Sequence, residues 1–350
     1  KIPYSVVECK EHIDEALKMA RKSCVLLKND GVLPIDKTKV NTIGVIGPNA
    51  DSRAALIGNY HGTSSEYITV LEGIREEAGD DVRILYSQGC DLYKDKVENL
   101  AWDQDRISEA VITAENSDVV ILCVGLDETL EGEEGDTGNS DASGDKVDLH
   151  LPKVQEELIE KVTAVGKPTI VVLMAGSAID LNYAQDNCNG ILLAWYPGAR
   201  GGRAIADLLF GKESPSGKLP VTFYKDLEGM PEFTDYSMKN RTYRYMEKEA
   251  LYPFGYGLTY SDTCVTEAEV VGEVSAESDI MLKATVKNNG TVDTDEVVQV
   301  YIKDLDSPLA VRNYSLCGFK RVSLKAGEEK SVESVSYTHL RAHETLSDLV

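Results

Sequence analysis

The most unusual stretch of the sequence is a run of carboxylic acids interspersed with glycines. Carboxyl groups can donate and accept protons, so a catalytic acid or base could lie in this run. Two other interpretations remain open: a solvated, mobile loop, or a calcium loop, although the spacing from Asp136 to Asp141 does not match an EF-hand. The acidic side chains of residues 126–148 are Asp127, Glu128, Glu131, Glu133, Glu134, Asp136, Asp141, Asp145 and Asp148.

Other familiar catalytic and cofactor-binding motifs are missing from the sequence. Residues 42–50 contain Gly44 and Gly47 but lack the Gly-x-Gly-x-x-Gly fingerprint of dinucleotide-binding folds. The glycines of residues 198–202 open a helical pattern that could bind an anion. No Gly-Lys-Ser/Thr follows them, which excludes a Walker loop and favours a packing role. No Gly-x-Ser-x-Gly elbow occurs, and the five histidines form no triad or metal pattern. We therefore expect no cofactor and no metal, and a nucleotide-binding protein is disfavoured.

Short apolar segments that alternate with helical patterns must position the acidic run. Residues 11–27 are predicted to form one helix, and Pro152 begins another whose apolar stripe extends to Val165. Strands buried on both faces and separated by helices indicate an α/β fold, a mostly parallel sheet sandwiched by helices. The expected buried strands are residues 42–46, 82–85, 119–124, 169–174 and 190–194.

The acidic run comes directly after the strand expected at residues 119–124. Ligands of open α/β sheets bind beyond the carboxyl ends of the strands. A long loop at this position is therefore where a catalytic carboxyl group would be delivered to a substrate.

The apolar pattern changes after about residue 260, where alternation with a period of two begins. Short strands at a spacing of ~10 residues, with Asn288-Asn289-Gly290-Thr291 as a turn, predict an antiparallel β-sandwich. The expected organisation is an α/β domain at residues 1–225, a linker at 226–262, a sandwich at 263–335 and a tail at 336–350.

Composition limits the classes of partner. The chain has 350 residues and a formal net charge of −23, which disfavours nucleic acids and anionic membranes. No apolar run approaches the ~20 residues of a membrane span. The seven cysteines show no pairing pattern, which favours reduced thiols in the cytoplasm.

A series of longer motifs runs along residues 1–335. This series resembles glycoside hydrolase family 3, the β-glucosidases and β-xylosidases, and its last two motifs resemble the fibronectin-type-III-like domain that ends such enzymes. The motifs are Ala20-Arg-Lys-Ser-Cys-Val-Leu-Leu-Lys-Asn-Asp30, Ile46-Gly-Pro-Asn-Ala-Asp51, Cys123-Val-Gly-Leu-Asp-Glu-Thr-Leu-Glu-Gly-Glu-Glu-Gly-Asp136, Trp195-Tyr-Pro-Gly-Ala-Arg-Gly-Gly202, Ser216-Gly-Lys-Leu-Pro-Val-Thr-Phe223, Tyr252-Pro-Phe-Gly-Tyr-Gly-Leu-Thr-Tyr260, Lys287-Asn-Asn-Gly290 and Glu296-Val-Val-Gln-Val-Tyr301.

The resemblance implies a retaining mechanism with two carboxyl groups: one attacks the anomeric carbon, and the other protonates the departing oxygen and later activates water. In this family the nucleophilic Asp lies in an N-terminal (β/α)₈ barrel. The acid/base Glu comes from the α/β domain and usually has Gly or Ala before it, Gly after it and Asp three residues on. Glu133 fits, with Gly132 before it and Asp136 after it, but Glu134 replaces the expected glycine. Glu131 and Glu134 therefore stay as alternatives, both expected on the solvated part of the loop.

The resemblance also implies a missing part, because the Ser-Asp-Trp type of nucleophile motif occurs nowhere in the chain. We expect the C-terminal fragment of an exo-acting β-glucosidase or β-xylosidase that hydrolyses terminal non-reducing β-linked sugars of plant-derived oligosaccharides. Its expected partners are the oligosaccharide and the barrel of the same polypeptide, and without the barrel it should be inactive. Residues 336–350 resemble translated adapter sequence, so the tail is expected to be artefactual and the sandwich truncated.

Three further expectations follow from this interpretation. A non-catalytic carbohydrate-binding or scaffolding module is the alternative function, although such a module would have no need of the proton donor Glu133. The surface that faces the barrel should be apolar and exposed, which would favour association into a homo-oligomer. Secretion stays open beside the cytoplasmic prediction, because the native N-terminus is expected upstream of Lys1.

Overall fold

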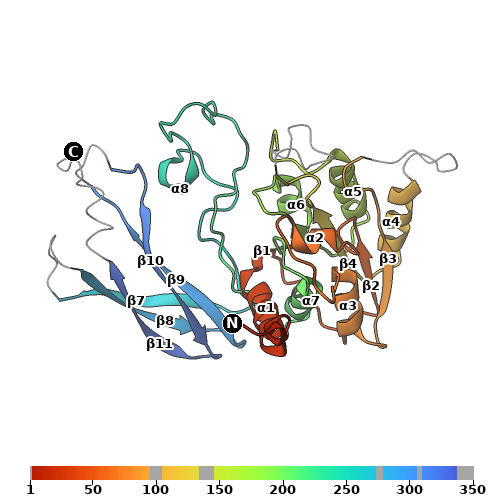
Figure 1. The fold of residues 1–350 in the computed structure, drawn as a ribbon, viewed down its shortest axis with the longest axis horizontal. Coiled ribbons are helices and arrows are strands. Elements are labelled where there is room, and N and C mark those ends of the chain that lie inside the picture. Colours follow the sequence, from red (N-terminus) through yellow and green to blue (C-terminus); the bar gives the residue numbers. More distant parts are fainter. Residues whose placement is uncertain (1, 95–104, 134–145, 273–278, 306–309, 337–350) are drawn as a thin grey trace. The chain divides into compact units, whose positions relative to one another are not determined.

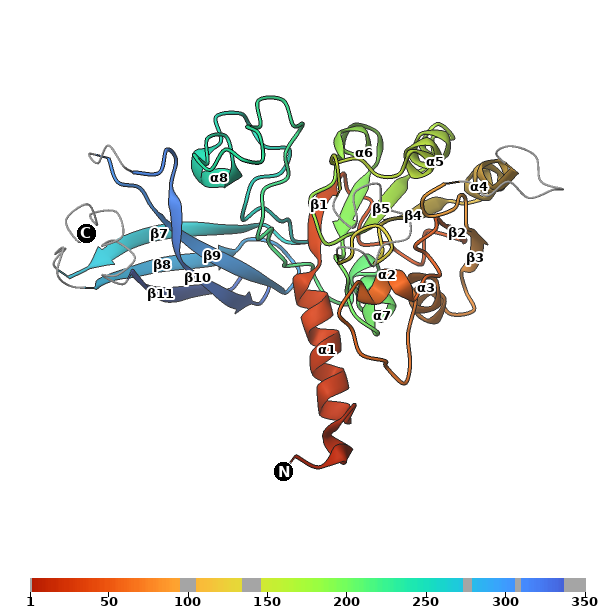
Figure 2. The same ribbon diagram turned by 45° about the horizontal axis from the view of Figure 1, so that its top comes forward.

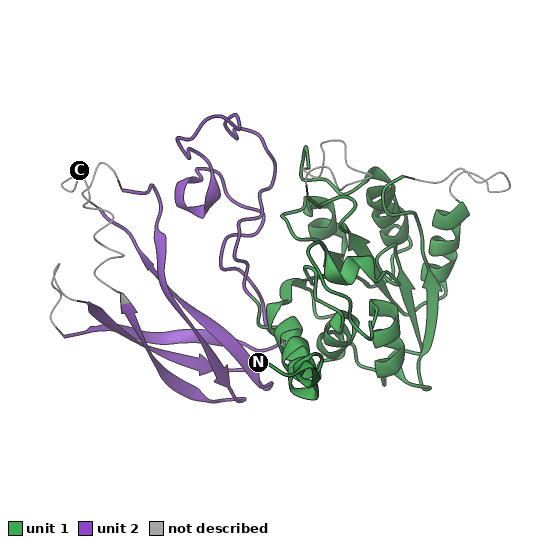
Figure 3. Ribbon diagram, viewed as in Figure 1, with its two compact units in different colours: residues 1–217 green, residues 218–350 purple. Residues whose placement is uncertain are grey.

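The computed structural model describes residues 2–94, 105–133, 146–272, 279–305 and 310–336. The chain divides into two compact units, residues 1–217 and 218–350, which are described separately (Figure 3). Within the described ranges, no helix has both the length and the apolar character needed to cross a membrane.

The first unit is built on a six-stranded sheet with the order β1-β6-β5-β4-β2-β3 (Figure 1). β2 to β6 run parallel, and β1 pairs antiparallel with β6 at the edge. Every residue of β4 and β5 is buried, as expected for parallel strands covered by helices. The predicted α/β fold is thus confirmed. Its strands are β1 (Val25–Asn29), β2 (Thr42–Ile46), β3 (Arg83–Ser87), β4 (Val119–Gly125), β5 (Thr169–Met174) and β6 (Gly190–Leu193).

Several helices of this unit pack against one another in two groups (Figures 1 and 2). In one group, α7 packs against both α1 and α3, and in the other, α4 packs against α5. Thr69 caps the N-terminus of α3 in a capping box. Its side chain accepts a hydrogen bond from the backbone N–H of Glu72, and the Glu72 side chain accepts one from the backbone N–H of Thr69. The elements are η1 (Tyr4–Val6), α1 (Lys10–Ser23), α2 (Ala54–Ile57), α3 (Val70–Ala78), α4 (Asp105–Glu115), α5 (Lys153–Thr163), α6 (Asn182–Asn187) and α7 (Gly201–Leu209).

The first helix is shorter than predicted. α1 ends at Ser23, and the residues that follow form β1 instead of a last helical turn. Cys24 and Leu27 have the spacing of one helix face, which is why the sequence favoured a helix as far as Leu27. However, all four residues from Cys24 to Leu27 are buried. One face of a helix cannot bury four consecutive side chains, whereas a covered strand can.

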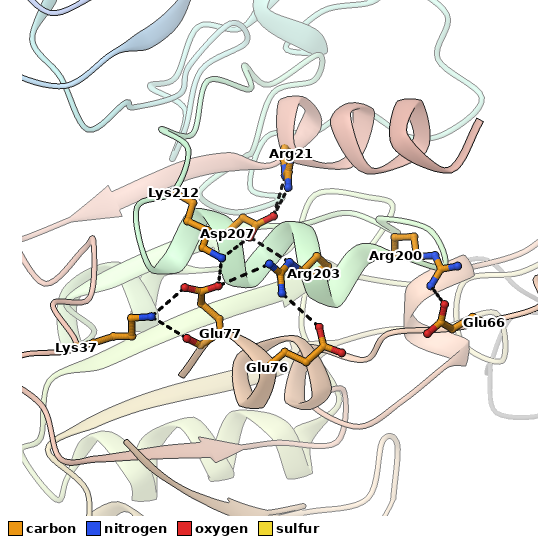
Figure 4. Close-up of polar contacts among 9 residues, drawn as sticks. All are labelled: Arg21, Lys37, Glu66, Glu76, Glu77, Arg200, Arg203, Asp207 and Lys212. Atoms are coloured by element: carbon orange, nitrogen blue, oxygen red, sulfur yellow. Dashed lines mark hydrogen bonds and ion pairs between the residues drawn. The ribbon is translucent and has the colours of Figure 1, made fainter. Parts of the chain in front are cut away.

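Ion pairs join helices of the first group (Figure 4). Asp207 in α7 is buried and accepts a hydrogen bond from Nε of Arg21 in α1 at 2.9 Å. Glu77 in α3 is also buried and forms ion pairs with Lys37 and Lys212. Burial opposes ionisation of Glu77, but the two ammonium groups outweigh it and hold the pKa of this carboxyl group below its usual value.

In its described residues the second unit contains five antiparallel strands in two sheets, with the orders β11-β8-β7 and β10-β9. Its small core contains valines and one leucine: Val286, Val298, Val322, Leu324 and Val332. The predicted antiparallel sandwich is confirmed. The strands are β7 (Thr263–Val271), β8 (Ile280–Asn288), β9 (Thr294–Ile302), β10 (Ser315–Leu324) and β11 (Glu329–Ser336).

The segment predicted as a linker, residues 226–262, contains one short helix, α8 (Thr242–Tyr245). The ring of Tyr243 stacks on Phe254 with a centroid distance of 4.2 Å, and Tyr301 of β9 meets both rings edge-on. Residues 337–350 lie outside the described part of the chain, so the artefactual tail stays a prediction.

Candidate functional site

The predicted acid/base loop leaves the sheet where the strand order reverses. β2 lies between β3 and β4, so the chain continues to one side of the sheet after β2 and to the other side after β4. Loops that follow such a pair of strands diverge, and ligands of open α/β sheets bind in the crevice between them. The segment that follows β4 therefore starts at the preferred ligand position of this fold.

Two glycines allow the close backbone approach at these strand ends. A Cβ atom on Gly47, which follows β2, would lie 2.0 Å from the carbonyl oxygen of Cys123. A Cβ atom on Gly125, the last residue of β4, would lie 1.9 Å from the carbonyl oxygen of Met174. Both glycines also have positive φ, +121° and +144°, which other residues rarely adopt. Larger residues at these positions would force the strand ends apart.

A buried amide fastens the start of the loop. Asn49, after β2, donates from Nδ2 to the carbonyl oxygen of Leu126 at 3.1 Å, and its backbone N–H donates to Cys123 at 3.3 Å. The side chain is fully buried, and its Oδ1 atom accepts no hydrogen bond from the described residues. Asn49 thus links the segments that follow β2 and β4.

The loop then turns around Asp127, which is buried. Its Oδ1 atom accepts hydrogen bonds from the backbone N–H and the hydroxyl of Thr129, at 2.8 and 2.6 Å. Its carbonyl oxygen accepts from the backbone N–H groups of Leu130 and Glu131, both at 3.0 Å. These contacts make Asp127 a turn residue, so it is not a free catalytic group.

Glu131 is anchored to the ends of two other strands. Its Oε2 atom accepts hydrogen bonds from the backbone N–H of Gly176, after β5, and from the hydroxyl of Tyr196, after β6, each at 2.7 Å. Burial raises the pKa of the Tyr196 hydroxyl, and the adjacent Glu131 carboxylate adds to this effect. We expected Glu131 on the solvated part of the loop, and this expectation was wrong.

Glu133 comes two residues after this anchor and is exposed. The remaining candidate, Glu134, lies outside the described residues, as do Asp136, Asp141 and Asp145. The structure thus separates one anchored carboxylate, Glu131, from one solvent-facing carboxylate, Glu133. The choice of Glu133 as acid/base stays a prediction.

Other charged groups lie around this segment. Nε2 of His61 lies 3.3 Å from Oε2 of Glu128, and Nζ of Lys146 donates to the carbonyl oxygen of Ala178 at 2.9 Å. Burial lowers the pKa of the Lys146 ammonium group, and the carboxylates of Glu131 and Asp148 oppose this shift. Within the described ranges no group of three His, Cys, Asp or Glu side chains is arranged to hold a metal ion. The calcium loop considered for residues 136–141 falls outside those ranges.

Sequence reasoning singled out the acidic run but missed Asn49, Gly176 and Tyr196 as site residues. Their positions carried a signal, because each comes directly after a predicted strand, and the carboxyl ends of parallel strands lie at one edge of the sheet.

Comparison with known protein families gives two matches. Residues 24–260 match the glycosyl hydrolase family 3 C-terminal domain, and residues 296–337 match a fibronectin type III-like domain. The first match covers both Asn49 and the segment with Glu131 and Glu133.

Individual proteins of this kind are also similar to the chain. A β-xylosidase of Formosa agariphila is 36% identical over 335 residues, which cover 92% of this chain and 44% of that protein. The periplasmic β-glucosidase of Salmonella typhimurium is 33% identical, with 93% of this chain and 45% of that protein covered. The solved structure of a β-glucosidase from Erythrobacter marinus superposes with a TM-score of 0.82 and 32% identity, covering 95% of this chain and 46% of that one. The chain thus spans less than half the length of these relatives.

Proposed function

Because the chain belongs to glycosyl hydrolase family 3, we propose that it is the C-terminal part of an exo-acting retaining β-glycosidase and contributes the general acid/base, Glu133. The observation that carries this proposal is the position of Glu133. It is exposed directly after a segment that hydrogen bonds fasten to the carboxyl ends of the sheet. A carboxyl group presented in this way can reach a sugar bound over the edge of the sheet.

Retaining hydrolysis requires two carboxyl groups about 5 Å apart, one on each side of the glycosidic bond. In the first step Glu133 would donate its proton to the glycosidic oxygen while the nucleophile, from the barrel of the same polypeptide, attacks the anomeric carbon. In the second step the Glu133 carboxylate would accept a proton from water, whose oxygen attacks the anomeric carbon and releases the nucleophile. Together the two steps return Glu133 to its starting protonation state.

The proposed substrates are β-glucosides or β-xylosides, cleaved at the terminal non-reducing sugar of plant-derived oligosaccharides. The matched relatives carry names of both kinds, β-xylosidase and β-glucosidase. The cytoplasmic location rests only on the unpatterned cysteines and stays a prediction.

The test compares leaving groups in the full-length polypeptide. Glu133→Ala should lose most of its kcat on a disaccharide, whose leaving oxygen needs a proton, and keep the first step with a dinitrophenyl glycoside. Glu128→Ala is the matched control, because it removes a carboxylate of the same loop that contacts His61. It should change both rates by a similar, small factor. Equal losses of kcat/KM on both substrates for Glu133→Ala would contradict the proposal, and unchanged values would favour a non-catalytic module.

A further inference from the structure

The ring of Tyr196 packs closely against two glycines. A Cβ atom on Gly58 would lie 2.6 Å from Cδ2 of the Tyr196 ring, and one on Gly176 would lie 3.0 Å from its Cε2. Contacts this short exclude any larger residue at Gly58 unless the ring moves. The ring therefore packs closely against the backbone of both glycines, along its Cδ2–Cε2 edge.

The residue before it is in an unusual conformation. Trp195 has a φ of +56°, which is rare for a bulky residue and persists only where the surroundings enforce it. Its indole Nε1 donates to the carbonyl oxygen of Ser23 at 3.1 Å. The strained turn thus directs Trp195 toward the end of α1 and Tyr196 toward the acid/base segment.

The hydroxyl of the packed Tyr196 ring contacts Glu131. The hydroxyl and the backbone N–H of Gly176 both donate to the same oxygen, Oε2, at 2.7 Å. Hydrogen bonds to an ionised acceptor are about twice as strong as neutral ones. Two residues of chain span at most about 7 Å, so an anchor at Glu131 restricts the volume that Glu133 can reach.

We propose that Tyr196 and Glu131 are positioning residues, which hold the loop so that Glu133 points at the glycosidic oxygen. This inference rests on the proposed function of Glu133 and adds two residues that do not themselves exchange protons with the substrate. A misplacement of about 1 Å can reduce a catalytic rate by up to ~10²-fold. Loss of the anchor should therefore lower the rates only of those steps that need Glu133.

The experiment uses the full-length polypeptide and measures kcat and KM on a disaccharide and on a dinitrophenyl glycoside. Tyr196→Phe and Glu131→Ala should each lower kcat on the disaccharide by about 10- to 100-fold and change the first step with the activated substrate by less than about 3-fold. Glu131→Gln keeps an oxygen that can accept both hydrogen bonds, so it should restore part of the loss. The double variant Tyr196→Phe/Glu131→Ala should be no slower than the slower single variant, because both changes break one anchor.

Tyr183→Phe is the matched control. It removes another hydroxyl, which contacts Thr163 at 3.2 Å on the exposed surface of α6, and should leave both rates unchanged. If Tyr196→Phe lowers kcat/KM equally for both substrates, its role is structural, and if it lowers kcat/KM for neither, the anchor is dispensable. Either result overturns the inference while Glu133→Ala still shows its selective loss. If Glu133→Ala itself shows no selective loss of activity on the disaccharide, both the proposed function and the positioning role are wrong.

Discussion

The side chain of Gln155 in α5 binds both backbone groups of Gly125 at the end of β4. The Gly125 N–H donates to Oε1, and Nε2 donates to the Gly125 carbonyl oxygen, each at 2.8 Å. Gln155 is fully buried, and its Nε2 also donates to the carbonyl oxygen of Leu92. One amide therefore satisfies both backbone groups at the strand end from which the proposed acid/base loop departs.

Replacing Gln155 by Leu should lower the free energy of unfolding by about 2–4 kcal/mol, because buried backbone groups would lose their partners. Urea unfolding followed by circular dichroism measures this change. Glu160→Ala, an exposed change on the same helix, should stay within about 0.5 kcal/mol. If Gln155→Leu also changed the free energy of unfolding by no more than about 0.5 kcal/mol, Gly125 would need no side-chain partner.

The ion pairs around Glu77 predict a pH dependence of stability. Its folded pKa lies below the unfolded value of 4.5, so near that pH the unfolded chain binds more protons than the folded chain. The stability that Glu77 contributes is therefore complete above pH 4.5 and is lost as the pH falls through the lower folded pKa. Glu77→Gln has no carboxyl group to titrate, so its unfolding free energy should fall less on acidification than that of the unchanged chain.

Glu76→Gln is the control for this pH series. Glu76 is the neighbour of Glu77 in α3, and its side chain is 53% exposed, with Arg203 at 3.3 Å. Exposed ion pairs contribute little, so this variant should follow the pH profile of the unchanged chain. Identical profiles for Glu76→Gln and Glu77→Gln would refute the role assigned to the buried carboxylate.

The 350-residue chain alone should not hydrolyse aryl β-glucosides or β-xylosides. In our account it holds the proton donor but not the nucleophile, and removing one member of such a pair removes the two-step reaction. Release of p-nitrophenol from the corresponding glycosides measures this directly. Turnover comparable to that of a full-length relative would mean that both carboxyl groups lie within this chain.

Much of the fold could be predicted from the sequence, because buried parallel strands are short apolar runs between helical patterns. The expected strands at residues 42–46 and 169–174 agree with β2 and β5 at both ends. β1 was missed because Cys24 and Leu27 continue the spacing of α1, and only pairing with β6 reveals a strand. The local spacing of apolar residues does not distinguish a last helical turn from a strand when tertiary contacts determine which one forms.

The site could be predicted only in part, for a similar reason. The acidic run after β4 was evident from composition, but the partners of Glu131 depend on strand order. Tyr196 lies 65 residues further along the chain and meets Glu131 only because the loops after β4, β5 and β6 share one edge of the sheet. Without knowledge of the strand order, the sequence does not distinguish a half-buried, anchored glutamate from a solvated one.

The most direct test of the central claim is azide rescue of Glu133→Ala in the full-length polypeptide. With a dinitrophenyl glycoside the variant should form the glycosyl-enzyme and then stall, because deglycosylation by water needs a general base. Azide needs no general base, so it should restore turnover and yield a β-glycosyl azide, whereas Glu134→Ala, which leaves Glu131 and Glu133 unchanged, should yield none. Rescue of Glu134→Ala but not of Glu133→Ala would contradict the account and assign the acid/base role to Glu134.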